Sequence, residues 1–414
     1  VISIIQTFLA PFIASIINNT TCFLCKFKLF VETKKLYWAI NFGKTTTKTI
    51  YILKRQASLL HKLKFILYPF SLLYGLITAI RNTLYDYHLL RSTSFNIPII
   101  SVGNLSVGGT GKTPHILYLL KVLKKRYSIV TLSRGYKRQS KGFVLANDQA
   151  NALNIGDEPM QLYLRCKLHA HIAVCENRVV GVRHILAQLP TTNLILLDDS
   201  FQHRAIQAGL SILLTDYNHL FYHDYLLPLG RLREARSAYK RADFIIVTKC
   251  PNNLSLQEQQ QIRQNLDLQT YQQAFFSTIS YKNPYHLLNQ KTLVLHKNKD
   301  VLLLCAIAKP SNLQNYLNAQ TTLRDEMLYS DHHFFTVKDL LQLKQRFEAI
   351  PSKEKVIITT EKDAARLLVH KNLLETYELP IYCLPITVQF LENDATLFEE
   401  KLCQYLLKTK KETL

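Results

Sequence analysis

The stretch Pro98-Ile-Ile-Ser-Val-Gly-Asn-Leu-Ser-Val-Gly-Gly-Thr-Gly-Lys-Thr-Pro114 decides the fold prediction. It begins as a buried strand over residues 97–102, enters a Gly-rich turn and leads into an apolar helix from about Pro114. A strand, a Gly-x-Gly-Lys-Thr turn and a helix in this order are the context of a phosphate-binding loop. The strict pattern has a Gly where this chain has Ser106. The stretch therefore predicts a nucleotide-binding α/β domain with one departure from the consensus.

The residue types of this loop predict their roles. Glycines let backbone N–H groups curl around phosphate oxygens, and the start of the following helix adds partial positive charge. Lys112 is expected to reach the β- and γ-phosphates, and the hydroxyl of Thr113 to ligate Mg²⁺. The residues assigned to the nucleotide are Gly108, Gly109, Thr110, Gly111, Lys112 and Thr113.

Short β-branched runs separated by helical lengths continue along the chain and are typical of a doubly wound parallel sheet. The predicted strands cover residues 127–132, 193–197, 210–215 and 243–248, and a helix is expected within 252–265. Strands at 301–305 and 355–359 predict a second, smaller α/β lobe. The predicted class is α/β: a P-loop NTPase-like doubly wound sheet, a second lobe and an N-terminal membrane-associated helix.

We predict four parts in the chain of 414 residues. Residues 1–55 are expected to be a non-native or disordered extension, with a second anchor segment as the alternative, because they lack the charge-then-apolar order of a secretory signal. Residues 56–92 are the predicted anchoring region. Residues 93–290 form the predicted P-loop core, and residues 291–414 the C-terminal α/β lobe.

Positive charge and apolar character coincide in the first quarter of the chain. The net charge is +21, and residues 1–100 hold Glu32 and Asp86 as their only acidic residues. Residues 65–80, FILYPFSLLYGLITAI, lie between Lys64 and Arg81. These sixteen residues are shorter than the roughly 20 that a spanning helix needs, so we expect a helix in one leaflet or a tilted short span. A buried core helix is the alternative, and no nucleic-acid-binding module is present in the sequence.

Cysteine usage does not point to metal or disulfide chemistry. Eight cysteines are scattered along the chain, and Cys22 and Cys25 form the one closely spaced pair. A lone C-x-x-C without a second pair is weak evidence for zinc, and we interpret the cysteines as reduced thiols.

Two carboxylates, Asp198 and Asp199, end the predicted strand at 193–197. An acidic residue at such a strand end holds Mg²⁺ in P-loop enzymes, and two buried anions need a nearby cation. We therefore predict that both contribute to a Mg²⁺ site. Gln202 follows within one turn and is expected to face the same cleft.

Several motifs together resemble the tetraacyldisaccharide 4'-kinase family. Besides residues 98–114 they are Ser133-Arg-Gly-Tyr136, Gly156-Asp-Glu-Pro159, Asp198-Asp-Ser-Phe-Gln-His-Arg204, Leu227-Pro-Leu-Gly-Arg-Leu-Arg-Glu234, Asp331-His332 and Thr360-Glu-Lys-Asp363. The resemblance covers roughly residues 60–400, and the family tolerates Ser at position 106. The chain departs from the family at Ala306-Ile-Ala-Lys-Pro310, where a Gly-rich turn is usual, and at Arg231, where Pro is common.

The resemblance implies an activity and a location. The γ-phosphate of ATP would pass, with Mg²⁺, to the 4'-hydroxyl of a tetraacyldisaccharide 1-phosphate, giving a bis-phosphorylated lipid A precursor. It implies a lipid-linked substrate and attachment to the cytoplasmic face of the bacterial inner membrane. No nucleic-acid partner and no obligate protein partner are expected.

The resemblance also implies catalytic residues. Asp157 resembles the general base that receives the hydroxyl proton, and His332 its partner, with His333 as the fallback. Lys112 and Arg233 complete the predicted catalytic set, because their charge neutralises phosphate oxygens. The predicted substrate-binding or supporting residues are Arg134, Glu158, Gln202 and Glu234. Pro251, where a guanine-reading loop would have Asp, favours ATP over GTP.

Two other functions remain compatible with the phosphate-binding loop taken alone. One is a soluble P-loop ATPase or GTPase of switch or metallochaperone type, which would hydrolyse nucleotide without lipid. The other is a membrane scaffold with a degenerate nucleotide site, which would tolerate Lys112→Ala.

Overall fold

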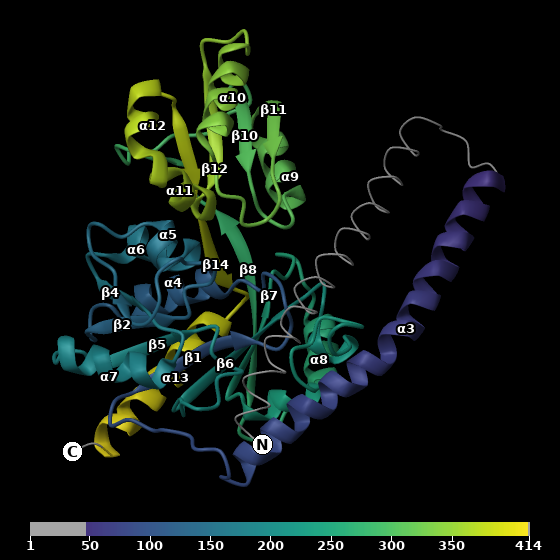
Figure 1. The fold of residues 1–414 in the computed structure, drawn as a ribbon, viewed down its shortest axis with the longest axis vertical. Helices are drawn as coiled ribbons and strands as arrows, with labels where there is room; N and C mark the ends of the chain where they lie inside the picture. The colour runs from purple at the N-terminus through teal and green to yellow at the C-terminus, as the bar shows by residue number, and fades with distance from the viewer. Residues whose placement is uncertain (1–46, 413–414) are drawn as a thin grey trace. The chain divides into compact units, whose positions relative to one another are not determined.

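The computed structural model describes residues 47–412 and the side chains of residues 65–408 (Figure 1). The predicted extension at 1–55 therefore lies largely outside the described residues. The chain divides into two compact units. Within the described residues, the first unit consists of residues 47–89, Leu105–Gly108 and Phe221–Ala238, and the second contains the rest.

A nine-stranded sheet in the order β14-β8-β7-β6-β1-β5-β2-β4-β3 is the base of the second unit (Figure 1). Its seven mutually parallel strands are β1 (Ile99–Asn104), β2 (Ile129–Ser133), β4 (Ala170–Val174), β5 (Leu194–Asp198), β6 (Leu210–Asp216), β7 (Phe244–Thr248) and β8 (Gln273–Tyr281). The short edge strands β3 (Val144–Leu145) and β14 (Ile386–Phe390) are antiparallel. The doubly wound parallel sheet predicted from the sequence is confirmed.

Helices cover both faces of this sheet, because its central strands are apolar on both sides. One core joins α4 (Lys112–Leu123), α6 (Asp157–Cys166) and α13 (Asp394–Glu412) to one face. The other core packs α7 (Arg178–Gln188) on the opposite face. The short α5 (Ala152–Ile155) directly precedes α6, and α8 (Leu256–Leu266) lies between β7 and β8 in the chain. This arrangement places the start of both α4 and α6 near the carboxyl ends of the strands.

A second sheet has five strands in the order β11-β10-β12-β13-β9. Its strands are β9 (Tyr285–His286), β10 (Asp300–Cys305), β11 (Thr322–Leu328), β12 (Lys355–Thr360) and β13 (Ile381–Leu384). Its helices are α9 (Ser311–Gln320) on one face, and α10 (Val337–Glu348), α11 (Glu361–Leu367) and α12 (Lys371–Tyr377) on the other. The smaller α/β lobe is therefore present.

The chain returns to the first sheet after completing the second. β14 pairs with β8 over Ile386–Phe390, and α13 packs on the nine-stranded sheet through Phe398 and Leu402. The predicted division near residue 290 stays a prediction, since the two sheets do not separate at one point along the sequence. β8 and β14 were missed because they alternate apolar and polar residues only in part.

The first unit consists of the long helix α3 (Thr47–Asp86) and the segments that it contacts. Ser71 Oγ donates to Leu226 O at 3.0 Å, and Tyr74 OH donates to Arg233 O at 2.8 Å. Asn82 Nδ2 donates to Glu234 Oε2 at 3.3 Å. A Cβ at Gly75 would lie 2.8 Å from a methyl group of Leu226, so this face of the helix fits closely against the segment. These contacts fix one polar face of α3.

Many of the other side chains of α3 between Phe65 and Ile80 are apolar and exposed. Phe65 is 83% exposed, and Leu72, Leu73 and Leu76 are each more than half exposed. Residues Phe65–Asp86 are long and apolar enough to cross a membrane by length and composition, and 6% of the apolar window is buried. The alternative of a buried core helix is therefore wrong. The helix is also longer than the predicted segment 65–80, because it begins at Thr47 and ends at Asp86.

Candidate active site

The phosphate-binding loop lies between β1 and α4, as predicted. Gly108 and Gly111 have φ angles of 113° and 88°, which favour glycine because other residues are strained there. Gly111 is the N-cap of α4 and contributes no side-chain cap. Because glycine has no side chain, Gly111 does not cap the N–H groups of the first turn of α4. The helix dipole adds partial positive charge at this end.

Two residues at the end of β7 hold the back of this loop. Thr248 Oγ1 donates to Thr110 O at 2.9 Å. Lys249 Nζ donates to Gly109 O and pairs with Asp216 Oδ2 at 2.9 Å. Because these bonds use carbonyl oxygens, they orient the loop without occupying its N–H groups.

The Lys112 ammonium is held by two oxygens at the carboxyl ends of the strands. Its Nζ lies 3.4 Å from Asn104 Oδ1 and 3.4 Å from Asp199 Oδ1. Gln202 Nε2 donates to Asn104 O at 2.8 Å, so this predicted residue does face the same site. Sequence reasoning missed Asn104, although a polar residue directly after a buried strand was an available signal.

Asp198 is a buried carboxylate at the end of β5. Its Oδ1 has no hydrogen-bond partner, and burial raises the pKa of Asp198 to about 7. That raised pKa already includes the negative charges of Glu158 and Asp199, which add to the effect of burial, and the positive charges of Lys112 and Arg178, which oppose it. An uncompensated buried carboxylate is costly, so the site fits a bound cation. Arg178, missed in the sequence, donates to Asp198 O at 3.4 Å from behind the strand.

The donor set suits Mg²⁺ held together with phosphate. Among residues 47–412, no three His, Cys, Asp or Glu side chains converge as a metal-binding cluster. Mg²⁺ needs few protein ligands, because it keeps waters and binds substrate phosphates. Asp198 and Asp199, with the hydroxyl of Thr113, fit such a site.

Asp157 and His332 form a hydrogen-bonded pair. His332 Nδ1 lies 2.8 Å from Asp157 Oδ2, and Asp157 is 4% exposed. Asp157 opens α6, where the helix N-terminus favours a negative charge, and its Oδ1 accepts from Glu158 N at 2.9 Å. His332 has a φ of 62°, a left-handed backbone conformation that is strained for a residue other than glycine.

The pKa of Asp157 is lowered below its usual value. Burial by itself raises that pKa, but the hydrogen bond from His332 lowers it. The positive charges of Lys362 and Arg366 lower it further. Asp157 is therefore a carboxylate at neutral pH.

His333 has a different place. Its ring stacks on Tyr329 with centroids 4.4 Å apart, and its Nε2 lies 3.0 Å from Asp339 Oδ2. Asp339 belongs to the capping box at the start of α10. The structure thus brings His332 to Asp157 and leaves His333 in a structural contact.

The helix α11 packs against α6 and contributes two cations that sequence reasoning left without a role. Lys362 Nζ lies 3.2 Å from His332 Nε2, and Arg366 Nε lies 3.4 Å from Asp157 Oδ2. The buried Glu361 joins the helices through an ion pair with Arg165 and a 3.4 Å hydrogen bond from Gln161. The Thr360-Glu-Lys-Asp363 motif was the available signal.

The remaining predicted residues lie in two environments. Arg134 is exposed after β2, and Glu158 Oε1 lies 3.5 Å from Lys362 Nζ. Arg233 and Glu234 belong to the first unit, where Arg233 N donates to Leu105 O at 2.7 Å and Glu234 is 1% exposed. Arg231, a departure from the family, pairs with Asp224 at 3.5 Å.

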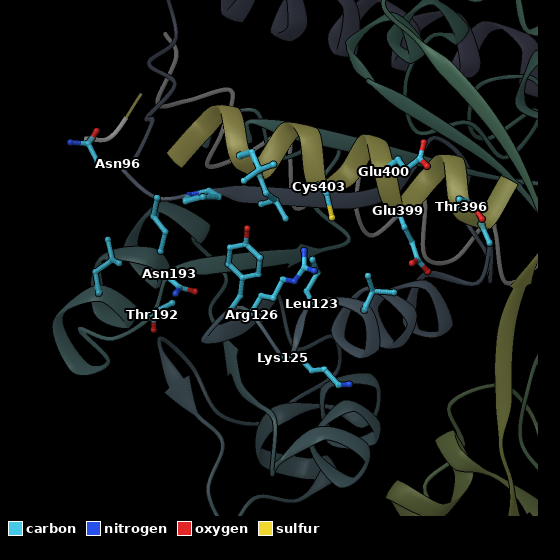
Figure 2. Close-up of a pocket in the computed structure, with 18 residues that line it drawn as sticks. Asn96, Leu123, Lys125, Arg126, Thr192, Asn193, Thr396, Glu399, Glu400 and Cys403 are labelled. Atoms are coloured by element: carbon cyan, nitrogen blue, oxygen red, sulfur yellow. The ribbon is translucent and has the colours of Figure 1, made fainter. Parts of the chain in front are cut away.

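A separate cavity of about 1000 Å³ lies at the opposite ends of the strands of the nine-stranded sheet (Figure 2). Its wall includes Asn96 before β1, Asn193 before β5 and Cys403 of α13. It is therefore at the amino ends of the strands, whereas ligands of doubly wound sheets bind at the carboxyl ends. We do not assign the nucleotide to it.

The parallel sheet, the loop before α4 and the carboxylates after β5 define a P-loop nucleotide-binding protein. The family model for tetraacyldisaccharide-1-P 4'-kinase matches residues 63–407, so the chain belongs to that family. It is 43% identical over 352 residues to the tetraacyldisaccharide 4'-kinase of Bacteroides thetaiotaomicron, covering 82% of this chain and 92% of the relative. It is 47% identical over 321 residues to that of Flavobacterium johnsoniae, covering 77% and 92%.

A solved structure shares the fold. The "apo" form of LpxK from Aquifex aeolicus in complex with ATP is similar with a TM-score of 0.65 and 28% identity. The match covers 84% of this chain and 99% of that chain. Membership in this family argues against the switch-type ATPase or metallochaperone as the function.

We expect Lys112→Ala to weaken ATP binding by about 10–100-fold, because a hydrogen bond to a charged group contributes about 1.5–3 kcal/mol. Calorimetric titration of the purified protein measures this change. Lys121→Ala, at an exposed position of the same helix, is the matched control and should bind ATP as the wild type does. Equal affinities of Lys112→Ala and wild type would remove Lys112 from the nucleotide site.

Proposed function

We propose that this chain transfers the γ-phosphate of ATP to the 4'-hydroxyl of a tetraacyldisaccharide 1-phosphate, giving a bis-phosphorylated lipid A precursor. The observation that carries the proposal is the pairing of Asp157 with His332 in a chain that also has a phosphate-binding loop. A nucleotide switch needs the loop, whereas transfer to an alcohol also needs a proton acceptor.

Asp157 is the proposed general base. During transfer the 4'-oxygen forms a bond to the γ-phosphorus, and the bond from that phosphorus to the bridging oxygen breaks, so its electron pair leaves on ADP. The hydroxyl proton passes to the Asp157 carboxylate. His332 positions this carboxylate through the 2.8 Å hydrogen bond. Lys112 and Arg233 neutralise charge on the phosphate oxygens.

Mg²⁺ is the proposed metal, held by Asp198, Asp199 and Thr113. When bound, it neutralises charge on the β- and γ-phosphate oxygens. The partnerless Oδ1 of Asp198 supports this assignment, because a cation would compensate it. Asp199 pairs with Lys112 in this structure. With Mg²⁺ bound, the negative charge of Asp199 would be shared between the Lys112 ammonium and the metal ion.

The acceptor side is proposed to use Arg134, Glu158, Gln202 and Glu234. Arg134 is exposed and offers a planar fork to an anionic saccharide. The exposed apolar side chains of α3, with Arg81 and Arg91 beyond them, support binding to a membrane surface that carries anionic lipid. For a lipid A precursor, that surface is the cytoplasmic face of the bacterial inner membrane.

The activity is tested with purified full-length protein, Mg-ATP and tetraacyldisaccharide 1-phosphate in detergent. We expect mass spectrometry to show one added phosphate per substrate molecule. Asp157→Asn should lower kcat by about 10²–10⁴-fold, because a general base contributes rate enhancement of that size, and should still bind ATP. No phosphorylated product from the wild type would refute the kinase proposal, and full turnover by Asp157→Asn would remove Asp157 from the base role.

The metal proposal predicts a change in Mg²⁺ dependence. Asp198→Asn should raise the Mg²⁺ concentration for half-maximal rate by about 10–100-fold, since even residues that only orient metal ligands have effects of that size. Asp148→Asn is the control, because Asp148 has a side chain that is 90% exposed. The rate is measured at saturating ATP over a Mg²⁺ series, and identical curves for Asp198→Asn and wild type would contradict the assignment.

The membrane proposal predicts weaker vesicle binding when α3 loses apolar surface. Leu72→Ser combined with Leu76→Ser should lower partitioning onto anionic vesicles at least about tenfold, because each exposed Leu contributes about 1.5–3 kcal/mol when buried. Leu256→Ser, at a 66% exposed position of α8, is the control and should partition normally. Cosedimentation measures the bound fraction, and unchanged binding by the double variant would exclude this face of α3 as the anchor.

A further inference from the structure

The start of α11 carries charges that the proposed function does not yet use. Thr360 caps this helix by accepting from Asp363 N, so Glu361, Lys362 and Asp363 form its first turn. Glu361 contacts α6, as described above. Lys362 is directed at the Asp157–His332 pair, which makes it the one first-turn residue with a contact to both members.

The Lys362 ammonium has a defined set of neighbours. Its Nζ lies 3.2 Å from His332 Nε2 and 3.9 Å from Asp157 Oδ2. It also lies 3.6 Å from Asp331 Oδ1, and its side chain is 18% exposed. The shortest of these distances is to the imidazole nitrogen, not to a carboxylate.

This geometry determines which nitrogen of His332 carries the proton. A lysine ammonium has three donors and no acceptor, so Nε2 must accept from it through a lone pair. A neutral imidazole with an accepting Nε2 has its proton on Nδ1. That nitrogen is the one 2.8 Å from Asp157 Oδ2, where a proton is needed to donate to the carboxylate.

If Nε2 of His332 carried the proton instead, neither ring nitrogen would have a suitable hydrogen-bond partner. A proton on Nε2 would face the Lys362 donors, and its nearest carboxylate oxygen, Asp331 Oδ2, is 3.8 Å away. That distance is too long for a hydrogen bond. Nδ1 would then present a lone pair to the Asp157 carboxylate, which is repulsive.

We propose that Lys362 is a positioning residue that holds His332 in the neutral tautomer protonated at Nδ1, so that His332 donates to Asp157 and does not itself accept the substrate proton. Asp157 thereby remains the proton acceptor of the pair. The inference rests on the proposed function, since it assigns a task to that same site.

Arg366 supports the same arrangement from inside the protein. Its side chain is fully buried, its Nη1 pairs with Asp363 at 3.2 Å and donates to His333 O at 3.0 Å. Its Nε lies 3.4 Å from Asp157 Oδ2. Because His333 directly follows His332, Arg366 fixes both the carboxylate and the backbone that carries the imidazole.

The charged and titratable groups around the pair come from four elements. They are Glu158 of α6, Asp331 after β11, Lys362, Asp363 and Arg366 of α11, and Tyr136 with Lys137 after β2; the Tyr136 ring meets that of His332 edge-on at 5.5 Å. Removing the Lys362 charge removes a stabilisation of the Asp157 carboxylate and raises the pKa of Asp157. The protonated carboxyl cannot accept a proton, so activity would be lost at a higher pH than in wild type.

The tautomer is measured by ¹⁵N NMR of the full-length protein labelled in its histidines, with the signals of His332 assigned by their loss in His332→Gln. We expect a protonated Nδ1 and an unprotonated Nε2 in wild type at neutral pH. In Lys362→Met the proton should move toward Nε2 in a measurable fraction of molecules. Protons on both nitrogens in the wild type, or an unchanged spectrum in Lys362→Met, would overturn the proposal.

The pH–rate profile gives an independent readout. In Lys362→Met the acid limb of the pH profile of kcat/KM for the lipid substrate should move up by about one pH unit. At a pH below the acid limbs of both proteins, this shift makes kcat/KM of the variant about tenfold lower than that of wild type. KM for ATP should not change. Lys362→Arg keeps the charge and should restore the limb at least in part. Lys371→Met is the matched control, because Lys371 pairs with Glu375 on exposed α12, and its profile should follow wild type.

These outcomes separate the two proposals. Full turnover by Asp157→Asn would refute the base assignment whatever Lys362 does. An inactive Asp157→Asn together with an unshifted acid limb in Lys362→Met would leave the base in place and refute the role of Lys362.

Discussion

The hydrogen bond between Asp157 and His332 is the contact on which the proposed catalytic arrangement depends. Asp157 opens a helix on the nine-stranded sheet, whereas His332 follows a strand of the five-stranded sheet. The pair therefore forms only when the α6 and α11 helices pack, and that packing includes the buried Glu361 and Ala365. A long-range polar contact of this kind needs apolar packing around it, because a half-satisfied buried network is costly.

The two buried carboxylates of the site, Asp157 and Asp198, have pKa values that are shifted in opposite directions. The protein itself compensates Asp157, whose pKa is lowered by His332, Lys362 and Arg366. Asp198 has an oxygen without a partner, and its pKa is raised to about 7. Two acids whose surroundings shift their pKa values in opposite directions are suited to different tasks. A carboxylate kept ionised by the protein suits a base, and one that is buried with an oxygen lacking a hydrogen-bond partner suits a metal ligand.

The sequence predicted the parts of this site that are local. The phosphate-binding loop and the strand ending in Asp198 each occupy one short stretch, and each is where it was expected. Arg178 and Lys362 were missed because their partners are distant in the sequence: Asp198 lies 20 residues from Arg178, and His332 lies 30 residues from Lys362. Spacing cannot reveal such contacts. The choice of His332 over His333 came from the resemblance alone, and the structure shows that His332 contacts Asp157 whereas His333 contacts Asp339.

A lowered pKa makes Asp157 a weak base, which at first conflicts with its proposed role. The conflict disappears when the order of bond changes is considered. In a loose transition state for phosphoryl transfer, the leaving bond is largely broken before the new oxygen–phosphorus bond is complete. The hydroxyl proton becomes acidic only as that new bond forms, so the site needs an acceptor that is always ionised more than one that is strongly basic. The cations on α11 satisfy that need, because they keep Asp157 charged while His332 orients it.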